Sequence, residues 1–203
     1  MPAELPLLFS AVLLAGGRSS RMPCDTAGRM IRGRPLWEHQ LATLRGIGPA
    51  ELFISGRADG PYAQCGCPIV ADETPDRGPL GGVATALRRT AHERVVVLAI
   101  DLPRMSSQFF TTLLREVVHV ERAVVPRNEE LFEPLAAVYT RACLPMAEEQ
   151  LRSADRSMQR FVRAIVRADL AVEYPISAVE KACFLNLNTE TDWQAICREG
   201  NGD

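Results

Sequence analysis

A glycine pair followed by hydroxyl and guanidinium side chains lies near the N-terminus, in the segment SAVLLAGGRSSRM. Because Gly16 and Gly17 have no side chains, backbone N–H groups at this point can approach an anion closely. The hydroxyl groups of Ser19 and Ser20 and the guanidinium of Arg21 are well suited to phosphate oxygens. This junction predicts a phosphate-binding loop, although its local chemistry also fits an ordinary turn after a strand.

Asp101 is a second candidate for chemistry, because it directly follows the strongly apolar run RVVVLAI. Leu102-Pro103 comes next, and proline disfavours a regular helix beside the carboxylate. Mg²⁺ in proteins typically binds one or two carboxylates together with substrate phosphates. We therefore expect Asp101 to bind a divalent metal. The alternative is that Asp101 caps the helix predicted to begin near Ser106, where serines already provide caps.

Two further polar segments precede helix-like stretches. The segment DETPDRGPLGG, from Asp72 onward, enters a helix that opens behind Gly78-Pro79, and helix N-termini attract anions. Asn186 and Asn188 are two residues apart, so both amides lie on one face of an extended segment. We expect the first segment to contact the ligand, and the second to bind polar ligand edges or a metal's water shell. The alternatives are an exposed surface loop for the first and a helix cap, at Asn188 or Thr189, for the second.

The elements that must position these residues alternate between strand-like and helix-like runs. The predicted strands are 8–14, 51–55, 68–71, 94–100, 122–126, 134–139, 170–174 and 184–187, and the predicted helices are 36–44, 80–90, 106–118, 142–152, 157–167 and 190–198. The alternation predicts one α/β domain over residues 1–203 with a mostly parallel sheet between helical layers. Ligands of such sheets bind beyond the carboxyl ends of the strands, where the glycine loop, the Asp72 segment and Asp101 all fall.

Composition excludes several classes of function. A net charge of −2 provides no overall field for nucleic acid or an anionic membrane, and no apolar stretch approaches 18 residues. Six cysteines without framework spacing indicate free thiols in a reducing cytoplasm. The basic residues include a single lysine, Lys181, and the arginines of the helix 157–167 fit a solvated face better than an anion site. No GxxxxGK[ST], GxGxxG, GxSxG or HExxH motif occurs.

With these motifs placed, the chain resembles the nucleotidyltransferases of the molybdenum cofactor guanylyltransferase family over nearly its full length. The motifs that carry the resemblance are LAGG-x-SSRM at 14–22, G-x-P-L at 33–36, GPL-x-G at 78–82, D-x-P at 101–103 and N-x-N-T at 186–189. The family's proline after the last motif is replaced by Glu190. Each motif is weak alone, whereas five in the family's order are strong evidence for fold and ancestry.

The resemblance implies a three-layer, Rossmann-like nucleotidyltransferase fold with a mixed, mostly parallel sheet, in a cytoplasmic enzyme with Mg²⁺ as cofactor. Its substrates would be GTP and molybdopterin, GMP would be transferred to the terminal phosphate of molybdopterin, and other proteins of the pathway would be transient partners. Arg21 and Asp101 would be the catalytic residues, and Asp101 the metal ligand. The implied nucleotide-binding residues are Leu14, Ala15, Gly16, Gly17, Arg21, Thr26, Asp72, Gly78 and Asp101, and the implied pterin-binding residues are Asn186 and Asn188.

One stretch departs from the family pattern. After R-M the family has G-x-D-K, whereas this chain has PCDT, so Thr26 replaces a lysine that neutralises triphosphate charge. Loss of such a cation in a dry site costs on the order of 10²–10³ in rate. Three interpretations follow: Arg29 or Arg18 supplies the charge, the protein uses another nucleotide such as CTP or another acceptor, or it binds nucleotide without turnover.

Overall fold

The computed structural model describes residues 7–16, 26–31, 33–71, 77–187 and 189–199 of the chain. The strands are β1 (Ser10–Leu14), β2 (Met30–Ile31), β3 (Arg34–Pro35), β4 (Glu51–Ser55), β5 (Ile69–Val70), β6 (Arg94–Ala99), β7 (Ala123–Asn128), β8 (Leu131–Phe132), β9 (Ala136–Thr140) and β10 (Ala171–Pro175). The α-helices are α1 (Leu36–Arg45), α2 (Gly78–Arg89), α3 (Ser107–Val120), α4 (Leu144–Arg152), α5 (Met158–Arg167) and α6 (Glu190–Glu199), and 3-10 helices cover Thr26–Gly28, Arg141–Cys143 and Glu180–Phe184.

Strand β1 lies inside the main sheet, whose order is β10-β7-β9-β6-β1-β4-β5, with β8 paired to the end of β7. It pairs in parallel with both β4 and β6, and β4 pairs in parallel with β5. Strand β9 runs antiparallel between β6 and β7. The predicted mostly parallel, mixed sheet is therefore confirmed.

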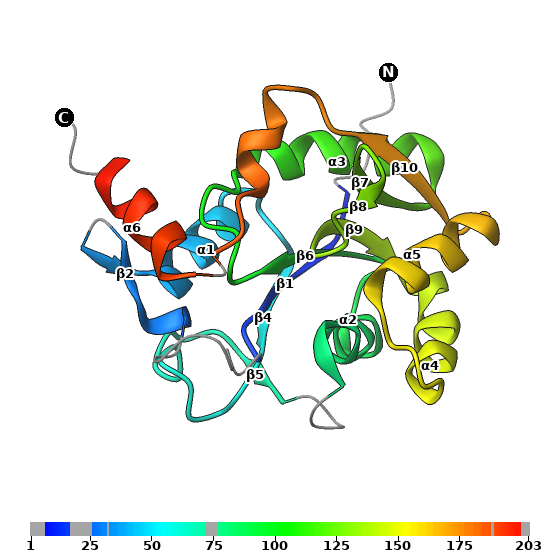
Figure 1. Ribbon diagram of the computed structural model, residues 1–203. Coiled ribbons are helices and arrows are strands. Elements are labelled where there is room, and N and C mark those ends of the chain that lie inside the picture. Colours follow the sequence, from blue (N-terminus) through cyan, green and yellow to red (C-terminus); the bar gives the residue numbers. More distant parts are fainter. Residues whose placement is uncertain (1–6, 17–25, 32, 72–76, 188, 200–203) are drawn as a thin grey trace, which may run out of the picture.

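Helices cover both faces of this sheet, so the molecule has three layers (Figure 1). Successive residues of β1 point to opposite faces, as in any strand. Val12 packs in a core with α2, α4 and α5, whereas Leu13 packs in a second core with α1 and α3. A strand buried on both faces has no polar alternation, which is why the apolar runs of β1 and β6 could be recognised as strands.

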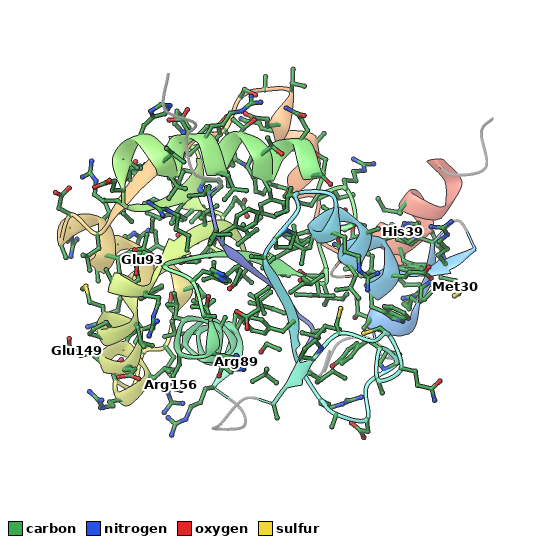
Figure 2. The ribbon with its side chains drawn as sticks, turned by 180° about the vertical axis from the view of Figure 1, so that it is seen from behind. Met30, His39, Arg89, Glu93, Glu149 and Arg156 are labelled. Atoms are coloured by element: carbon green, nitrogen blue, oxygen red, sulfur yellow. The ribbon has the colours of Figure 1, made fainter. Side chains whose placement is uncertain are left out.

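Helix α5 is amphipathic, as its sequence predicts. Its buried side chains are Met158, Phe161, Val162 and Ile165, and its exposed arginines are Arg160, Arg163 and Arg167. The arginines line a groove of about 540 Å³ between α4 and α5. In the view with side chains, Arg156 and Glu149 of this region lie on the opposite side of the molecule from Met30 and His39 (Figure 2).

The other predicted elements are present with bounds shifted by at most two residues, but the strand predicted over 184–187 is wrong. Phe184 ends a 3-10 helix, and the three residues after it form no strand pairing. The apolar pattern arises instead because Leu185 and Leu187 pack in a small third core with α6. The short hairpin of β2 and β3 was not predicted, since each of its strands has two residues.

None of the helices in the described part of the chain is both long and apolar enough to span a bilayer.

Candidate nucleotide-binding site

The carboxyl ends of β1, β4 and β6 meet at one edge of the sheet. Leu14, the last residue of β1, is in register with Ser55 of β4 and with Ala99 of β6. Hydrogen bonds continue past the strands: the Ala15 N–H donates to the Ser55 carbonyl at 2.8 Å, and the Ile100 N–H donates to the Leu14 carbonyl at 3.0 Å. The start of the glycine loop and the segment that carries Asp101 are therefore neighbours.

Asp101 stands at the tip of β6 with its carboxyl group partly buried. Burial raises the pKa of Asp101, and a hydrogen bond from its own backbone N–H offsets only part of this rise. No described residue forms an ion pair with it. The alternative role as a helix cap is wrong, because the Ser106 hydroxyl caps α3 by accepting the Phe109 N–H at 3.3 Å.

A buried glutamine of α1 holds the backbone on either side of Asp101. Gln40 is 1% exposed, and its Nε2 donates to the Leu102 carbonyl at 2.7 Å. The same nitrogen lies 3.5 Å from the Ala99 carbonyl and 3.4 Å from the Ile100 carbonyl. Sequence reasoning missed Gln40, because a lone glutamine within an amphipathic helix gives no sign that it faces inward.

A tyrosine from the β4–β5 connection fixes the start of the glycine loop. The Tyr62 hydroxyl accepts the Arg57 N–H at 2.9 Å and donates to the Ala15 carbonyl at 3.3 Å. Gly56 and Gly60 make room for it, because a Cβ at either position would lie within 2.4 Å of a Tyr62 ring or hydroxyl atom. Tyr62 is fully buried and was also missed from the sequence.

The remaining predicted nucleotide-binding residues are placed as follows. Gly16 is exposed at the edge beyond β1, and Gly78 begins α2 with a φ of 63°, a conformation that favours glycine. Thr26 is buried at the start of a 3-10 helix. Gly17, Arg18, Arg21, Asp72 and Asn188 lie outside the described residues.

The segment predicted to face the pterin contacts the tip of β6. The Leu187 N–H donates to the Asp101 carbonyl at 2.9 Å, while the side chain of Asn186 is exposed. Thr189 and Asp192 cap α6 reciprocally: the Thr189 hydroxyl accepts the Asp192 N–H at 3.2 Å, and the Asp192 carboxylate accepts the Thr189 N–H at 2.8 Å. The capping interpretation is thus confirmed for Thr189.

Arg29 is engaged with the C-terminal helix. Its guanidinium forms an ion pair with Glu190 at 2.7 Å and lies 4.2 Å from the centroid of the Trp193 ring. Of the two arginines considered as replacements for the missing lysine, Arg29 therefore has its charge paired with a carboxylate of α6.

The start of the glycine loop and the Asp101 carboxylate lie at adjacent parallel strand ends, which is where α/β domains of this kind bind their ligands. Residues 11–170 match the model of the MobA-like NTP transferase domain. The chain belongs to this family, and it is a nucleotidyltransferase.

Similar sequences agree with this assignment. The chain is 41% identical over 170 residues, 82% of its length and 83% of the relative's, to the "Probable molybdenum cofactor guanylyltransferase" of Opitutus terrae. It is 33% identical over 197 residues, 94% and 95% of the two lengths, to the molybdenum cofactor guanylyltransferase of Xanthomonas euvesicatoria.

Solved structures show the same fold. Molybdopterin-guanine dinucleotide biosynthesis protein A from Archaeoglobus fulgidus superposes with a TM-score of 0.78 at 22% identity, covering 94% of this chain and 97% of that one. The 2-C-methyl-D-erythritol 4-phosphate cytidylyltransferase from Thermus thermophilus has a TM-score of 0.67 at 16% identity, with 93% and 96% covered.

Proposed function

We propose that this chain transfers GMP from GTP to the terminal phosphate of molybdopterin, with Mg²⁺ as cofactor. The observation that carries the proposal is the meeting of three motifs at one sheet edge: Leu14 and Ala15 lie beside the β6 tip, and Leu187 is hydrogen-bonded to Asp101. A nucleotide on the first motif and an acceptor beside the third would both lie next to the carboxylate of the second.

The reaction requires alignment and charge neutralisation more than acid–base chemistry. A terminal phosphate oxygen of the acceptor attacks the α-phosphorus of GTP, the bond to the bridging oxygen breaks, and pyrophosphate leaves. Holding both reactants in line removes much of the entropic barrier. In this proposal the backbone of Leu14–Gly16 lies along the base, and Asn186 and Asn188 face the pterin. Gly17, Arg21, Thr26, Asp72 and Gly78 complete the nucleotide contacts, with Arg21 at the phosphates.

The donor chemistry at Asp101 fits Mg²⁺. Its carboxyl group is partly buried with a raised pKa, and no described cation neutralises it. The described residues contain no group of three or more His, Cys, Asp or Glu side chains that could hold a metal by themselves. A single carboxylate suits Mg²⁺, which completes its coordination with substrate phosphates and water. When bound, Mg²⁺ would offset the negative charge that develops on the phosphates.

The test is pyrophosphate release by the purified protein with molybdopterin and Mg²⁺, comparing GTP with CTP, ATP and UTP. Of the four nucleotides, only GTP is expected to release pyrophosphate. This release should require both Mg²⁺ and molybdopterin, and Asp101→Ala should abolish it. Release from another nucleotide would contradict the choice of base. Undiminished release by Asp101→Ala would contradict the assigned metal ligand.

A second candidate function is nucleotide binding without turnover, and two observations favour it. Thr26, at the position of the family's lysine, is a buried neutral side chain, and the charge of Arg29 is paired with Glu190. Under this alternative the wild-type protein binds GTP·Mg²⁺ but releases no pyrophosphate, and Thr26→Lys restores release. A thermal shift with each nucleotide measures binding independently of turnover, because a ligand of the folded state alone raises Tm.

We also infer that residues 1–203 fold as one MobA-like domain located in the cytoplasm. The family match across 11–170 and the packing of α6 against β2 and α1 support a single unit. The free thiols of Cys65, Cys67 and Cys143 support a reducing compartment. Contacts with other proteins of molybdenum cofactor synthesis are expected to be transient.

A further inference from the structure

Arg29 joins two parts of the chain that are 161 residues apart in sequence. Its Nη2 lies 2.7 Å from the Glu190 carboxylate, and its Cζ lies 4.2 Å from the centroid of the Trp193 ring. The Arg29 side chain is only 12% exposed. A guanidinium that is largely removed from water and stacked on tryptophan is at the stronger end of cation–π interactions. The contact of Arg29 with α6 is thus a specific interaction and not a chance pairing of surface charges.

Apolar packing reinforces the same contact. Trp193 and Ile196 of α6 form a small core with Ile31, Leu36 and Leu187. Figure 1 shows α6 beside β2 and the start of α1, away from α2, α4 and α5 on the other side of the molecule. Because Leu187 belongs to this core, the position of α6 and the position of the segment before it are coupled.

The segment that precedes α6 is hydrogen-bonded to Asp101 and continues into the capped first turn of α6. Its Leu187 N–H is hydrogen-bonded to the Asp101 carbonyl at 2.9 Å. Thr189 is fixed to the first turn of α6 through its reciprocal cap with Asp192. Since α6 is itself held by Arg29, a displacement of α6 would pull this segment away from Asp101.

We propose that Arg29, Glu190 and Trp193 form a latch that holds residues 185–187 against Asp101, and that Arg29 is a positioning residue for the acceptor substrate. The inference rests on the proposed function, which places the phosphorylated pterin at this segment. It assigns Arg29 a role other than replacement of the missing lysine: Arg29 affects the acceptor through α6 and does not contact the nucleotide.

The test compares Arg29→Met, which keeps an apolar stem, with Glu190→Gln, which keeps shape but removes the charge. Each variant is assayed for the KM of GTP and of molybdopterin, and for hydrogen exchange of residues 185–199 and 94–99. Glu148→Gln is the matched control, because it removes an ion pair of similar length, Arg88–Glu148 at 2.6 Å, at the contact of α2 with α4.

The latch predicts that Arg29→Met raises the KM for molybdopterin by roughly tenfold or more while the KM for GTP changes less than about twofold. Glu190→Gln should give a smaller change in the same direction, and exchange should rise in 185–199 but not in 94–99. The reciprocal variant Arg29→Glu with Glu190→Arg should recover part of the loss, since it restores the ion pair without the stacking on Trp193. Glu148→Gln should behave as wild type.

Two results would overturn the latch. One is an increased KM for GTP with an unchanged KM for molybdopterin, which would place Arg29 at the nucleotide. The other is unchanged exchange and unchanged kinetics in both variants. If the wild-type protein releases no pyrophosphate, the proposed function fails, and the latch is then judged from the equilibrium Kd of molybdopterin. Equal Kd values for wild type and Arg29→Met, or no binding by either, would refute it.

Discussion

Replacing the buried glutamine behind the Asp101 carboxylate tests the architecture of the site most directly. Gln40 donates from Nε2 to the Leu102 carbonyl at 2.7 Å, and the carbonyls of Ala99 and Ile100 lie within 3.5 Å of the same nitrogen. Gln40→Leu keeps a similar volume but removes the donor. Leu102 is 2% exposed, so water has little access to its carbonyl. The Leu102 carbonyl also accepts the Met105 N–H at 3.1 Å, so the variant removes one of its two hydrogen bonds.

The expected loss of stability follows from that lost hydrogen bond. A buried intramolecular hydrogen bond contributes about 0.5–1.5 kcal/mol net. For a chain of 203 residues, each kcal/mol lowers Tm by about 2–4 °C, so Tm should fall by roughly 1–6 °C. The backbone of 99–102 also carries Asp101, and a displacement of about 1 Å at a reacting centre can reduce the rate by roughly 10²-fold. We therefore expect kcat to fall by about 10–10²-fold as well.

Urea unfolding followed by tryptophan fluorescence measures the first effect, and pyrophosphate release measures the second. Gln108→Leu is the control, because Gln108 is exposed on α3 and its replacement should change stability by less than about 0.5 kcal/mol. A Gln40→Leu protein as stable as this control would refute the hydrogen-bond argument. A destabilised variant with wild-type kcat would show that Gln40 supports the fold without positioning Asp101.

Three further outcomes are expected. Burial alone would raise the pKa of Glu51, but the Ser10 hydrogen bond and neighbouring positive charges outweigh it and lower the pKa below its ordinary 4.5. Glu51→Gln should therefore lower the free energy of unfolding by about 1–2 kcal/mol at neutral pH. The difference should shrink in acid, as the folded-state carboxylate is protonated. Tyr62→Phe removes the hydrogen bond to the Ala15 carbonyl, so urea titration should show a loss of about 1–3 kcal/mol and calorimetry a weaker affinity for GTP. Asp101→Asn should stabilise the nucleotide-free protein at neutral pH, because the raised pKa of Asp101 means that its ionisation costs stability above the ordinary value of 3.8. Thermal melts should show that this gain in Tm vanishes below that pH. GTP·Mg²⁺ should no longer raise the Tm of the variant.

The layers of the fold could be predicted because their signals are local. Continuous apolar runs at β1 and β6 indicate strands buried on both faces, and the 3.6-residue period of α5 indicates an amphipathic helix. Strand order has no local signal: β9 lies between β6 and β7 although its residues come after both in sequence. The error at 184–187 has a related cause, since Leu185 and Leu187 are apolar to fill a core with α6 and not to extend the sheet.

Some residues of the candidate site could likewise be predicted from the sequence, and others could not. Asp101 and the start of the glycine loop could be found because each directly follows a recognisable strand, and strand ends determine where ligands bind in α/β sheets. Gln40 and Tyr62 could not be found, because each acts on a backbone carbonyl that is 62 or 47 residues away in sequence. Every residue has a backbone carbonyl, so the sequence does not show which carbonyl a side chain will donate to. Side chains such as Gln40 and Tyr62 can therefore be assigned this role only from the folded structure.

Arg29 shows why residue type and position alone do not determine the role of a charge. It follows a position where the related motif has a lysine, so its sequence context favours a phosphate ligand. In the fold it has a carboxylate at 2.7 Å and an indole ring at 4.2 Å, both from α6. To bind a phosphate, Arg29 would have to leave a charge-assisted hydrogen bond and a largely desolvated cation–π contact. A phosphate would also have to compete with a carboxylate already in place, so Arg29 is suited to fasten α6 and poorly suited to neutralise GTP.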